Sequence, residues 1–241
     1  MKTIVVIPTY DEKDNVKPMA DAVLQTPDVE LLFVDDNSPD GTASIVKTLQ
    51  HEYIENLHLL ERPGKQGLGV AYIAGFKWSL EHNYDFVFEM DADFSHNPDD
   101  LIRLYDTCKL HGADMSVGSR YVSGVNVVNW PMKRVLLSYF ASKYVRFITR
   151  MPLRDATAGF VCYSSKVLKS LNLDEIKFKG YAFQIEMKFR IWKSGFKVIE
   201  VPIIFTDRKE GTSKMNGGII KEAVWGVISL KLESMSKKNK A

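Results

Sequence analysis

The sequence predicts an α/β protein built around a mostly parallel central sheet, with helices on both faces. Short, fully apolar runs alternate with helical patterns along the first half of the chain, and each run ends in a cluster of polar residues. Strands that are apolar on both sides are typical of parallel sheets covered by helices. In such sheets ligands bind beyond the carboxyl ends of the strands, so the polar clusters at those ends are candidate site residues.

The expected strands and helices follow one another in a regular order. Strands are predicted at residues 3–8, 31–34, 57–60, 85–90 and 115–118. Helices are predicted at residues 12–24 and 42–49, after Gly67, and in a segment that Pro98 opens. The helix after Gly67 carries a stripe of small residues formed by Ala71, Gly75 and Ser79.

Two further helices with basic character are predicted beyond these strands. No acidic residue lies between Asp114 and Asp155, and a helix from about residue 133 would align apolar residues on one face and basic residues on another. These are Leu137, Ala141, Tyr144 and Ile148 on the first face, and Lys143, Arg146 and Arg150 on the second. Such a helix suits a membrane interface. The alternative is a core-packing helix with a solvated basic face.

Length and composition predict one catalytic domain over residues 1–218, followed by an amphipathic helix and basic tail over residues 219–241. The two cysteines, Cys108 and Cys162, suit a reducing compartment and give no zinc framework. No apolar stretch approaches the roughly 20 residues of a membrane span. Because Met1-Lys2 leads directly into a strand, we expect no signal peptide. The expected location is cytoplasmic, peripheral on the cytoplasmic face of the membrane.

The tripeptide Asp91-Ala92-Asp93 stands where the strand at residues 85–90 meets a loop. Two carboxylates at this spacing can share a divalent cation such as Mg²⁺ and still face substrate phosphates. The alternative is a solvated turn, and His96 is expected to cap this loop.

Equivalent strand ends carry Pro8-Thr9-Tyr10-Asp11-Glu12, Asp35-Asp36 and Gly118-Ser119-Arg120-Tyr121. An acidic pair, an aromatic side chain and an arginine on one rim indicate a nucleotide site, although phosphate loops of the Walker and dinucleotide-binding types are absent.

Several motifs together resemble the dolichol-phosphate mannosyltransferases, which are inverting family 2 glycosyltransferases with a GT-A fold. The matching segments run in the same order from Ile4 to about Gly218. They are Pro8-Thr9-Tyr10-x-Glu12, Val34-Asp35-Asp36-Asn37-Ser38-Pro39-Asp40-Gly41-Thr42, Gly67-Leu68-Gly69, Asp91-Ala92-Asp93-Phe94-Ser95-His96, Gly118-Ser119-Arg120-Tyr121, and Asp207-Arg208 through Ser213-Lys214. Two positions depart from the pattern. Relatives often carry Gly or Asp at Asn37, and some place Gln at Ser95.

The resemblance implies a role for each matching residue. The nucleoside would be held by Pro8, Tyr10, Glu12, Val34 and Asp36. The diphosphate and a Mg²⁺ or Mn²⁺ ion would meet Asp91, Ala92 and Asp93, with Asp93 the main ligand and Ser95 assisting. Phosphates would contact Arg120, Arg208 and Lys214, and the lipid phosphate would also meet Arg134 and Ser138. Glu12 has an equally weighted alternative as a helix-start residue.

The implied reaction is inverting transfer of mannose from GDP-mannose to a polyprenyl phosphate. The expected partners are these two substrates, the membrane surface and a membrane-anchoring protein, with no role for nucleic acid. No side-chain general base is needed, because a phosphate monoester with a second pKa near ~6 is largely a dianion at neutral pH. One alternative is a related transferase that uses another nucleotide sugar, such as UDP-glucose, or another acceptor. The other is a non-catalytic nucleotide-sugar-binding membrane adaptor, against which the intact Asp91, Asp93 and Arg120 argue.

Overall fold

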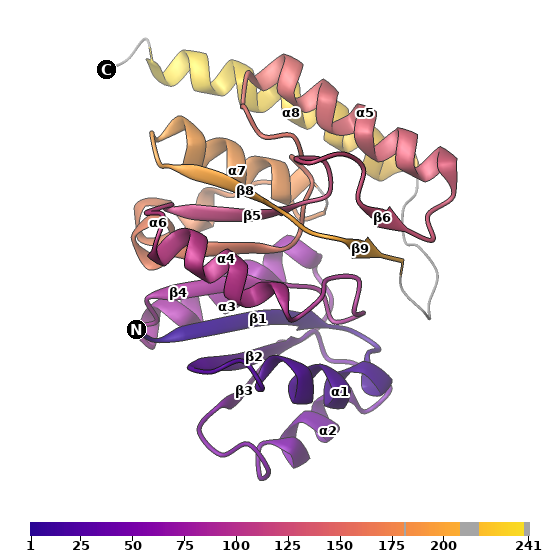
Figure 1. Ribbon diagram of the computed structural model, residues 1–241, viewed down its shortest axis with the longest axis vertical. Coiled ribbons are helices and arrows are strands. Elements are labelled where there is room, and N and C mark those ends of the chain that lie inside the picture. The colour runs from indigo at the N-terminus through magenta and orange to yellow at the C-terminus, as the bar shows by residue number, and fades with distance from the viewer. Residues whose placement is uncertain (181, 208–216, 239–241) are drawn as a thin grey trace.

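The β-branched run at the N-terminus forms the middle of the central sheet. Strand β1 (Thr3–Thr9) pairs in parallel with β2 (Val29–Asp35) on one side and with β4 (Phe86–Glu89) on the other. The computed structural model describes residues 1–180, 182–207 and 217–238. Within these ranges the main sheet has seven strands in the order β3-β2-β1-β4-β7-β5-β8 (Figure 1).

One short strand runs against all the others in this sheet. Strand β3 (Leu57–Glu61) pairs in parallel with β2, and β5 (Met115–Ser119) pairs in parallel with β8 (Val198–Pro202), whereas β7 (Val161–Ser164) lies antiparallel between β4 and β5. The expected mostly parallel α/β architecture is therefore confirmed, but the apolar runs did not predict β7. Because β7 starts where its neighbours end, the loop that precedes it lies at the carboxyl edge of the parallel strands.

Helices cover both faces of the sheet, each over its own apolar core. One core contains residues of α1 (Lys13–Val23), α2 (Thr42–Leu49) and α4 (Asp100–Lys109). The other contains residues of α3 (Leu68–Glu81), α5 (Met132–Thr149), α6 (Ser165–Ser170), α7 (Ala182–Lys193) and α8 (Gly217–Lys238). A 3₁₀ turn spans Leu173–Glu175, and β6 (Val127–Val128) pairs with β9 (Phe205–Thr206) in a small separate sheet.

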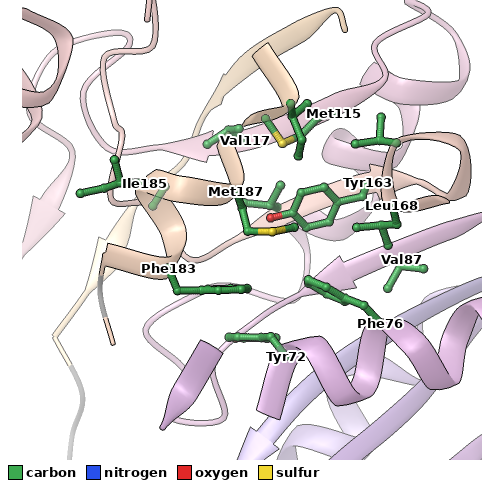
Figure 2. Packing of buried hydrophobic residues seen from close by; sticks show 14 of the residues in the cluster. Tyr72, Phe76, Val87, Met115, Val117, Tyr163, Leu168, Phe183, Ile185 and Met187 are labelled. Atoms are coloured by element: carbon green, nitrogen blue, oxygen red, sulfur yellow. The ribbon is translucent and has the colours of Figure 1, made fainter. Parts of the chain in front are cut away.

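The predicted small-residue stripe on α3 is what lets this helix approach the sheet. Ala71, Gly75 and Ser79 are all buried. A Cβ atom on Gly75 would lie 2.4 Å from Val6 Cγ1, so no larger residue fits there without a shift. Aromatic side chains complete the contact between α3 and α7. The Tyr72 and Phe183 rings lie parallel at 6.0 Å, which directs α3 against the start of α7 (Figure 2).

The helix expected to open at Pro98 begins two residues later, at Asp100. Pro98 and Asp99 belong to a turn in which the Asn97 side chain accepts a hydrogen bond from the Asp99 backbone N–H at 3.2 Å. This contact is of the capping type, which satisfies a backbone donor at the start of a helix, so Pro98 lies in the capped turn that leads into α4.

Helices α5 and α8 lie side by side at one end of the molecule (Figure 1). Val145 of α5 and Val227 and Leu230 of α8 are buried in the core on this face of the sheet. Gly226 permits a close approach, because a Cβ atom there would lie 2.6 Å from the Phe178 ring. The helix expected from about residue 133 is confirmed, and its Lys143, Arg146 and Arg150 are exposed as predicted.

Candidate active site

A cavity of about 340 Å³ opens at the carboxyl edge of the sheet, below α5 and α8. Six of the predicted site residues line it, although they come from distant parts of the chain: Asp91, Asp93, Ser95, Arg120, Arg134 and Ser138. The remainder of the lining is mainly apolar and is supplied largely by α5, α7 and α8. The cavity therefore has charged side chains at one end and a mainly apolar lining elsewhere.

The loop after β4 is held in one shape by its own polar groups. The Ser95 backbone N–H donates to Asp93 Oδ1 at 3.1 Å, and Phe94 takes a left-handed conformation with φ of 58°. The Asp91 backbone N–H donates to His96 Nδ1 at 3.3 Å, which bears out the expectation that His96 caps this loop. Burial lowers the pKa of His96 to about 4, so the ring is neutral at physiological pH. Its Nδ1 is then the acceptor and its Nε2 carries the proton.

The donor set at this loop fits a hard divalent cation. Asp91 and Asp93 supply carboxylates, and Ser95 supplies a buried hydroxyl oxygen that makes no hydrogen bond with any described group. Buried hydroxyl groups ordinarily have a hydrogen-bond partner. A buried hydroxyl oxygen without one, beside two carboxylates, is suited to coordinate Mg²⁺ or Mn²⁺. Tyr72 Oη donates to Asp91 Oδ1 at 3.3 Å and helps fix that carboxylate.

Arg120 is locked in place by a partner that the sequence did not reveal. Its Nε donates to Asp155 Oδ2 at 2.7 Å and its Nη2 to Asp155 Oδ1 at 2.6 Å, while the Arg120 backbone N–H also reaches Oδ2 at 3.0 Å. Nη2 donates as well to Thr157 Oγ1 at 2.9 Å. Burial opposes the charge on both groups, yet the Asp155 carboxylate raises the pKa of Arg120, and Arg120 lowers that of Asp155. The sequence signal was Asp155 itself, which ends the long segment without acidic residues.

Arg134 and Ser138 lie one helical turn apart on α5, as predicted, and both face the same cavity. Arg134 Nη1 donates to Asp207 Oδ1 at 2.7 Å, and its guanidinium stacks 4.0 Å from the centre of the Trp130 ring. The buried Trp130 Nε1 makes no hydrogen bond with any described group. This end of the cavity therefore offers donors to an anion.

The residues expected to hold the nucleoside lie at the ends of β1 and β2, outside the lining of this cavity. Lys65 Nζ lies 3.8 Å above the centre of the Tyr10 ring, and Asp36 pairs with Arg62. Burial raises the pKa of Asp36, although Arg62 opposes that shift.

The other expected nucleoside and diphosphate residues differ in what they expose. Glu12 directly precedes α1 and accepts from Asn15 Nδ2 at 2.8 Å, which fits its alternative role at the helix start. Val34 and Ala92 are buried, so only their backbone atoms are candidates for contact with a ligand. Pro8 is half-buried at the end of β1. Arg208 and Lys214 lie outside the described residues.

A buried polar cluster behind the cavity was missed altogether. Lys188 of α7 is fully buried and donates to Ala158 O and to the Gln184 side chain. Burial raises the pKa of the neighbouring Glu89 to about 7, against the opposing effects of Lys188, Gln184 and Tyr163. These residues belong to segments that are far apart in sequence, so no local motif marked them.

Comparison with known proteins assigns the chain to a family. The family model described as "Glycosyl transferase family 2" matches residues 4–171, which include β1, β2 and the Asp91-Ala92-Asp93 loop. The chain belongs to glycosyl transferase family 2. The GT-A fold and the glycosyltransferase activity expected from the sequence motifs are thereby confirmed.

Two curated relatives match nearly the whole of this glycosyltransferase. It is 44% identical to the polyprenol monophosphomannose synthase of Mycolicibacterium smegmatis, over 94% of this chain and 87% of that protein. It is also 44% identical to the undecaprenyl-phosphate mannosyltransferase of Micrococcus luteus, over 94% of this chain and 95% of that protein. The resemblance drawn from the motifs is therefore confirmed at the level of the whole chain.

Solved structures support the fold. The glucosyl-3-phosphoglycerate synthase of Mycobacterium tuberculosis superposes with a TM-score of 0.67 at 15% identity, covering 97% of this chain and 79% of that one. That enzyme was solved with Mn²⁺, UDP and its glucosylated product. At this identity the likeness concerns the fold alone.

Proposed function

We propose that this glycosyltransferase moves mannose from GDP-mannose to a polyprenyl phosphate, inverting the anomeric centre to give a β-linked mannosyl phosphate and GDP. The observation that carries the proposal is the cavity itself. Carboxylates and guanidinium groups line one end, and apolar side chains, many of them from α5 and α8, line much of the rest. A lipid with a phosphate head group matches both parts, and both curated relatives are named for polyprenol-type acceptors.

The acceptor phosphate would be held by Arg120, Arg134 and Ser138. Asp155 and Thr157 occupy the Nε and Nη2 donors of Arg120, so the Nη1 donors are the ones suited to a ligand in the cavity. Charge-assisted bonds from two guanidinium groups favour a dianionic phosphate monoester over a neutral alcohol. Because the phosphate is already ionised near neutral pH, its oxygen attacks the anomeric carbon without a side-chain base, and GDP leaves from the opposite face.

Asp93, Asp91 and Ser95 would hold a divalent cation, Mg²⁺ or Mn²⁺, together with the donor diphosphate. The ion, when bound, supplies positive charge that stabilises the departing diphosphate. The nucleoside would lie along the ends of β1 and β2 on Pro8, Tyr10, Glu12, Val34 and Asp36. Arg208 and Lys214 are further proposed phosphate contacts.

We also propose that the protein acts as a peripheral protein on the cytoplasmic face of a membrane, either directly or with an anchoring partner. None of the described helices combines the length and apolar character that a bilayer span requires. Helices α5 and α8 nevertheless expose large apolar side chains, including Phe140, Phe147 and Trp225. The cations Arg146 and Arg150 are exposed as well, and Arg150 lies 5.6 Å from the centre of the Phe147 ring. This combination suits an interface with anionic lipid.

The function is tested with purified protein, undecaprenyl phosphate in detergent, and either GDP-mannose or UDP-glucose, each with Mg²⁺ or Mn²⁺. We expect transfer from GDP-mannose, loss of transfer with chelator, and a β-linked product by NMR. Asp93→Ala should abolish transfer while the protein stays folded, because the half-buried Asp93 belongs to neither core. Asp99→Ala, an exposed aspartate six residues further on, is the matched control and should keep full activity. Transfer only from UDP-glucose, an α-linked product, or undiminished transfer by Asp93→Ala would each contradict the proposal.

A further inference from the structure

A small hollow beside Gly159 opens into the active-site cavity. A Cβ atom built on Gly159 would meet three groups at ordinary contact distances: Gln184 Nε2 at 3.7 Å, His96 Cε1 at 3.7 Å and Asp91 Oδ2 at 3.9 Å. All four residues line the cavity. We call the space bounded by Gly159, Gln184, His96 and Asp91 the Gly159 niche. A single added carbon atom fits there without a clash.

The Gln184 side chain, which provides a hydrogen-bond donor to the niche, is held in one orientation. Lys188 Nζ donates to Gln184 Oε1 at 2.9 Å, to Gln184 O at 3.2 Å and to Ala158 O at 2.6 Å. Burial lowers the pKa of Lys188 to about 8, which still leaves it protonated at neutral pH, with Glu89 and Asp155 favouring the charge. An ammonium group can only donate, so it selects the amide oxygen of Gln184 and leaves the NH₂ group to border the niche. Its three N–H groups match its three acceptors, so Lys188 supports the niche and does not contact a ligand there.

The acceptor side is equally constrained. Tyr72 Oη donates to Asp91 Oδ1 at 3.3 Å. The Asp91 backbone N–H is held by His96 Nδ1. Asp91 Oδ2 is then the carboxylate oxygen that borders the niche. The His96 ring forms one wall, and its centre lies 5.1 Å from the centre of the Phe160 ring.

The chemistry of the niche selects its occupant. It combines an anionic acceptor with a neutral amide donor. The Asp91 carboxylate repels an anion that no metal ion bridges to it, whereas a hydroxyl group can donate to the carboxylate and accept from the amide. Since Asp91 also belongs to the loop assigned to the diphosphate and metal, a sugar attached to that diphosphate lies within reach.

We propose that the Gly159 niche receives one hydroxyl or hydroxymethyl group of the sugar being transferred, and that Gln184 is a specificity-determining residue for that sugar. The proposal rests on the proposed function only in requiring a nucleotide-sugar donor. It makes Lys188 a positioning residue, since Lys188 acts through the orientation of Gln184.

Two variants test the niche without disturbing the core. In Gly159→Ala the new methyl group fills the niche at ordinary contact distances. In Gln184→Glu the carboxylate keeps a partner for Lys188 but removes the NH₂ donor. Both should lower kcat/KM for GDP-mannose by about 10- to 100-fold, the effect of losing one buried hydrogen bond to a substrate hydroxyl, while the affinity for GDP measured by calorimetry stays unchanged. Gly180→Ala, where a Cβ atom meets nothing within 4 Å, is the matched control.

A panel of GDP-mannose analogues, each lacking the 2-, 3-, 4- or 6-hydroxyl group, identifies the occupant. For one deoxy donor, kcat/KM should be low with the native protein. Gly159→Ala should lower kcat/KM for that donor much less than it lowers kcat/KM for GDP-mannose. This coupling is a readout that a merely structural role would not produce. If the native protein prefers another nucleotide sugar, the proposed function fails, but the same comparison with that sugar's deoxy analogues still tests the niche. Equal losses for every donor, equal losses of GDP affinity, or native kinetics in both variants would overturn the niche proposal.

Discussion

Two arginine–aspartate pairs flank Trp130, and they differ in burial and in geometry. Arg120 and Asp155 have side chains that are 9% and 0% exposed and are joined by a bidentate contact with a further backbone bond. Arg134 and Asp207 have side chains that are 26% and 25% exposed and are joined by a hydrogen bond of 2.7 Å. The guanidinium carbons lie 5.5 Å and 4.0 Å from the Trp130 ring centre.

The comparison indicates that Arg120 keeps its aspartate partner, whereas Arg134 can exchange its partner for a ligand. Removing one partner of a buried pair leaves an uncompensated charge, so Arg120 cannot leave Asp155 to follow a ligand. A partly exposed pair is worth little by itself, so Arg134 can give up Asp207 for a substrate phosphate at small cost. In the proposed function, Arg120 would therefore define where an anion binds, and Arg134 would respond to its arrival.

The largest expected effect is on stability. Asp155→Ala should lower the free energy of unfolding by about 3–5 kcal/mol, because the Arg120 charge stays buried without its partner. Urea unfolding followed by circular dichroism measures this change. The pair Arg120→Met with Asp155→Leu should regain most of the stability while remaining inactive. A loss below about 1 kcal/mol in Asp155→Ala would mean that water or another group compensates Arg120, and the distinction between the two pairs would fail.

The same pair gives a pH dependence with a definite sign. Arg120 lowers the pKa of Asp155 below its ordinary value of 3.8. The pair therefore stabilises the fold at pH values above 3.8, and this contribution is lost as the pH falls through the lower pKa of the folded state. In Asp155→Ala, the remaining acid sensitivity of unfolding should be smaller.

The second expected effect is on the acceptor and leaves stability almost unchanged. Arg134→Ala should lower kcat/KM for polyprenyl phosphate by about 10- to 150-fold, the range for a lost hydrogen bond to a charged group. The melting temperature and the KM for GDP-mannose should stay close to native values. Lys133→Ala, an exposed cation beside it on α5, is the control and should behave as native. Native acceptor kinetics in Arg134→Ala would show that the exchangeable pair does not meet the acceptor.

The smallest expected effect is on membrane binding by two cations, one on α5 and one directly after it, that do not line the cavity. Arg146→Ala and Arg150→Ala should each weaken binding to phosphatidylserine vesicles about 5-fold, corresponding to roughly 1 kcal/mol per basic residue near an anionic surface. Vesicle co-sedimentation at fixed salt measures this binding. Lys169→Ala on α6 is the control, since this exposed lysine lies on a different helix. Equal losses for all three variants would mean that net charge alone drives the association.

The N-terminal half of the fold was readable from the sequence because its signals are local. Apolar runs marked β1, β2, β3, β4 and β5, and the motifs at their ends placed Asp91, Asp93 and Arg120 at the same edge. Arg134 and Ser138 followed from helical spacing together with the resemblance to a family.

The remainder depends on contacts between distant segments. Strand β7 is only four residues long and pairs with β4 and β5, whose positions in the sheet are fixed by other strands. Asp155 is recognisable as a structural residue only once Arg120, 35 positions away, is known to be buried. Gln184 and Lys188 read as ordinary polar positions on a helix until α7 is packed behind the cavity.

Strand β9 contacts both halves of the active site, and this has a thermodynamic consequence. The Thr206 backbone N–H donates to Ser95 O at 3.2 Å beside the proposed metal ligands, and the next residue, Asp207, holds Arg134. If donor binding at the Ser95 loop shifts β9 and thereby loosens the Arg134 pair, the affinity for the acceptor rises by some factor. Linkage then requires the bound acceptor to raise the affinity for the donor by the same factor. The cooperativity between the two substrates would thus have its origin in a strand of two residues.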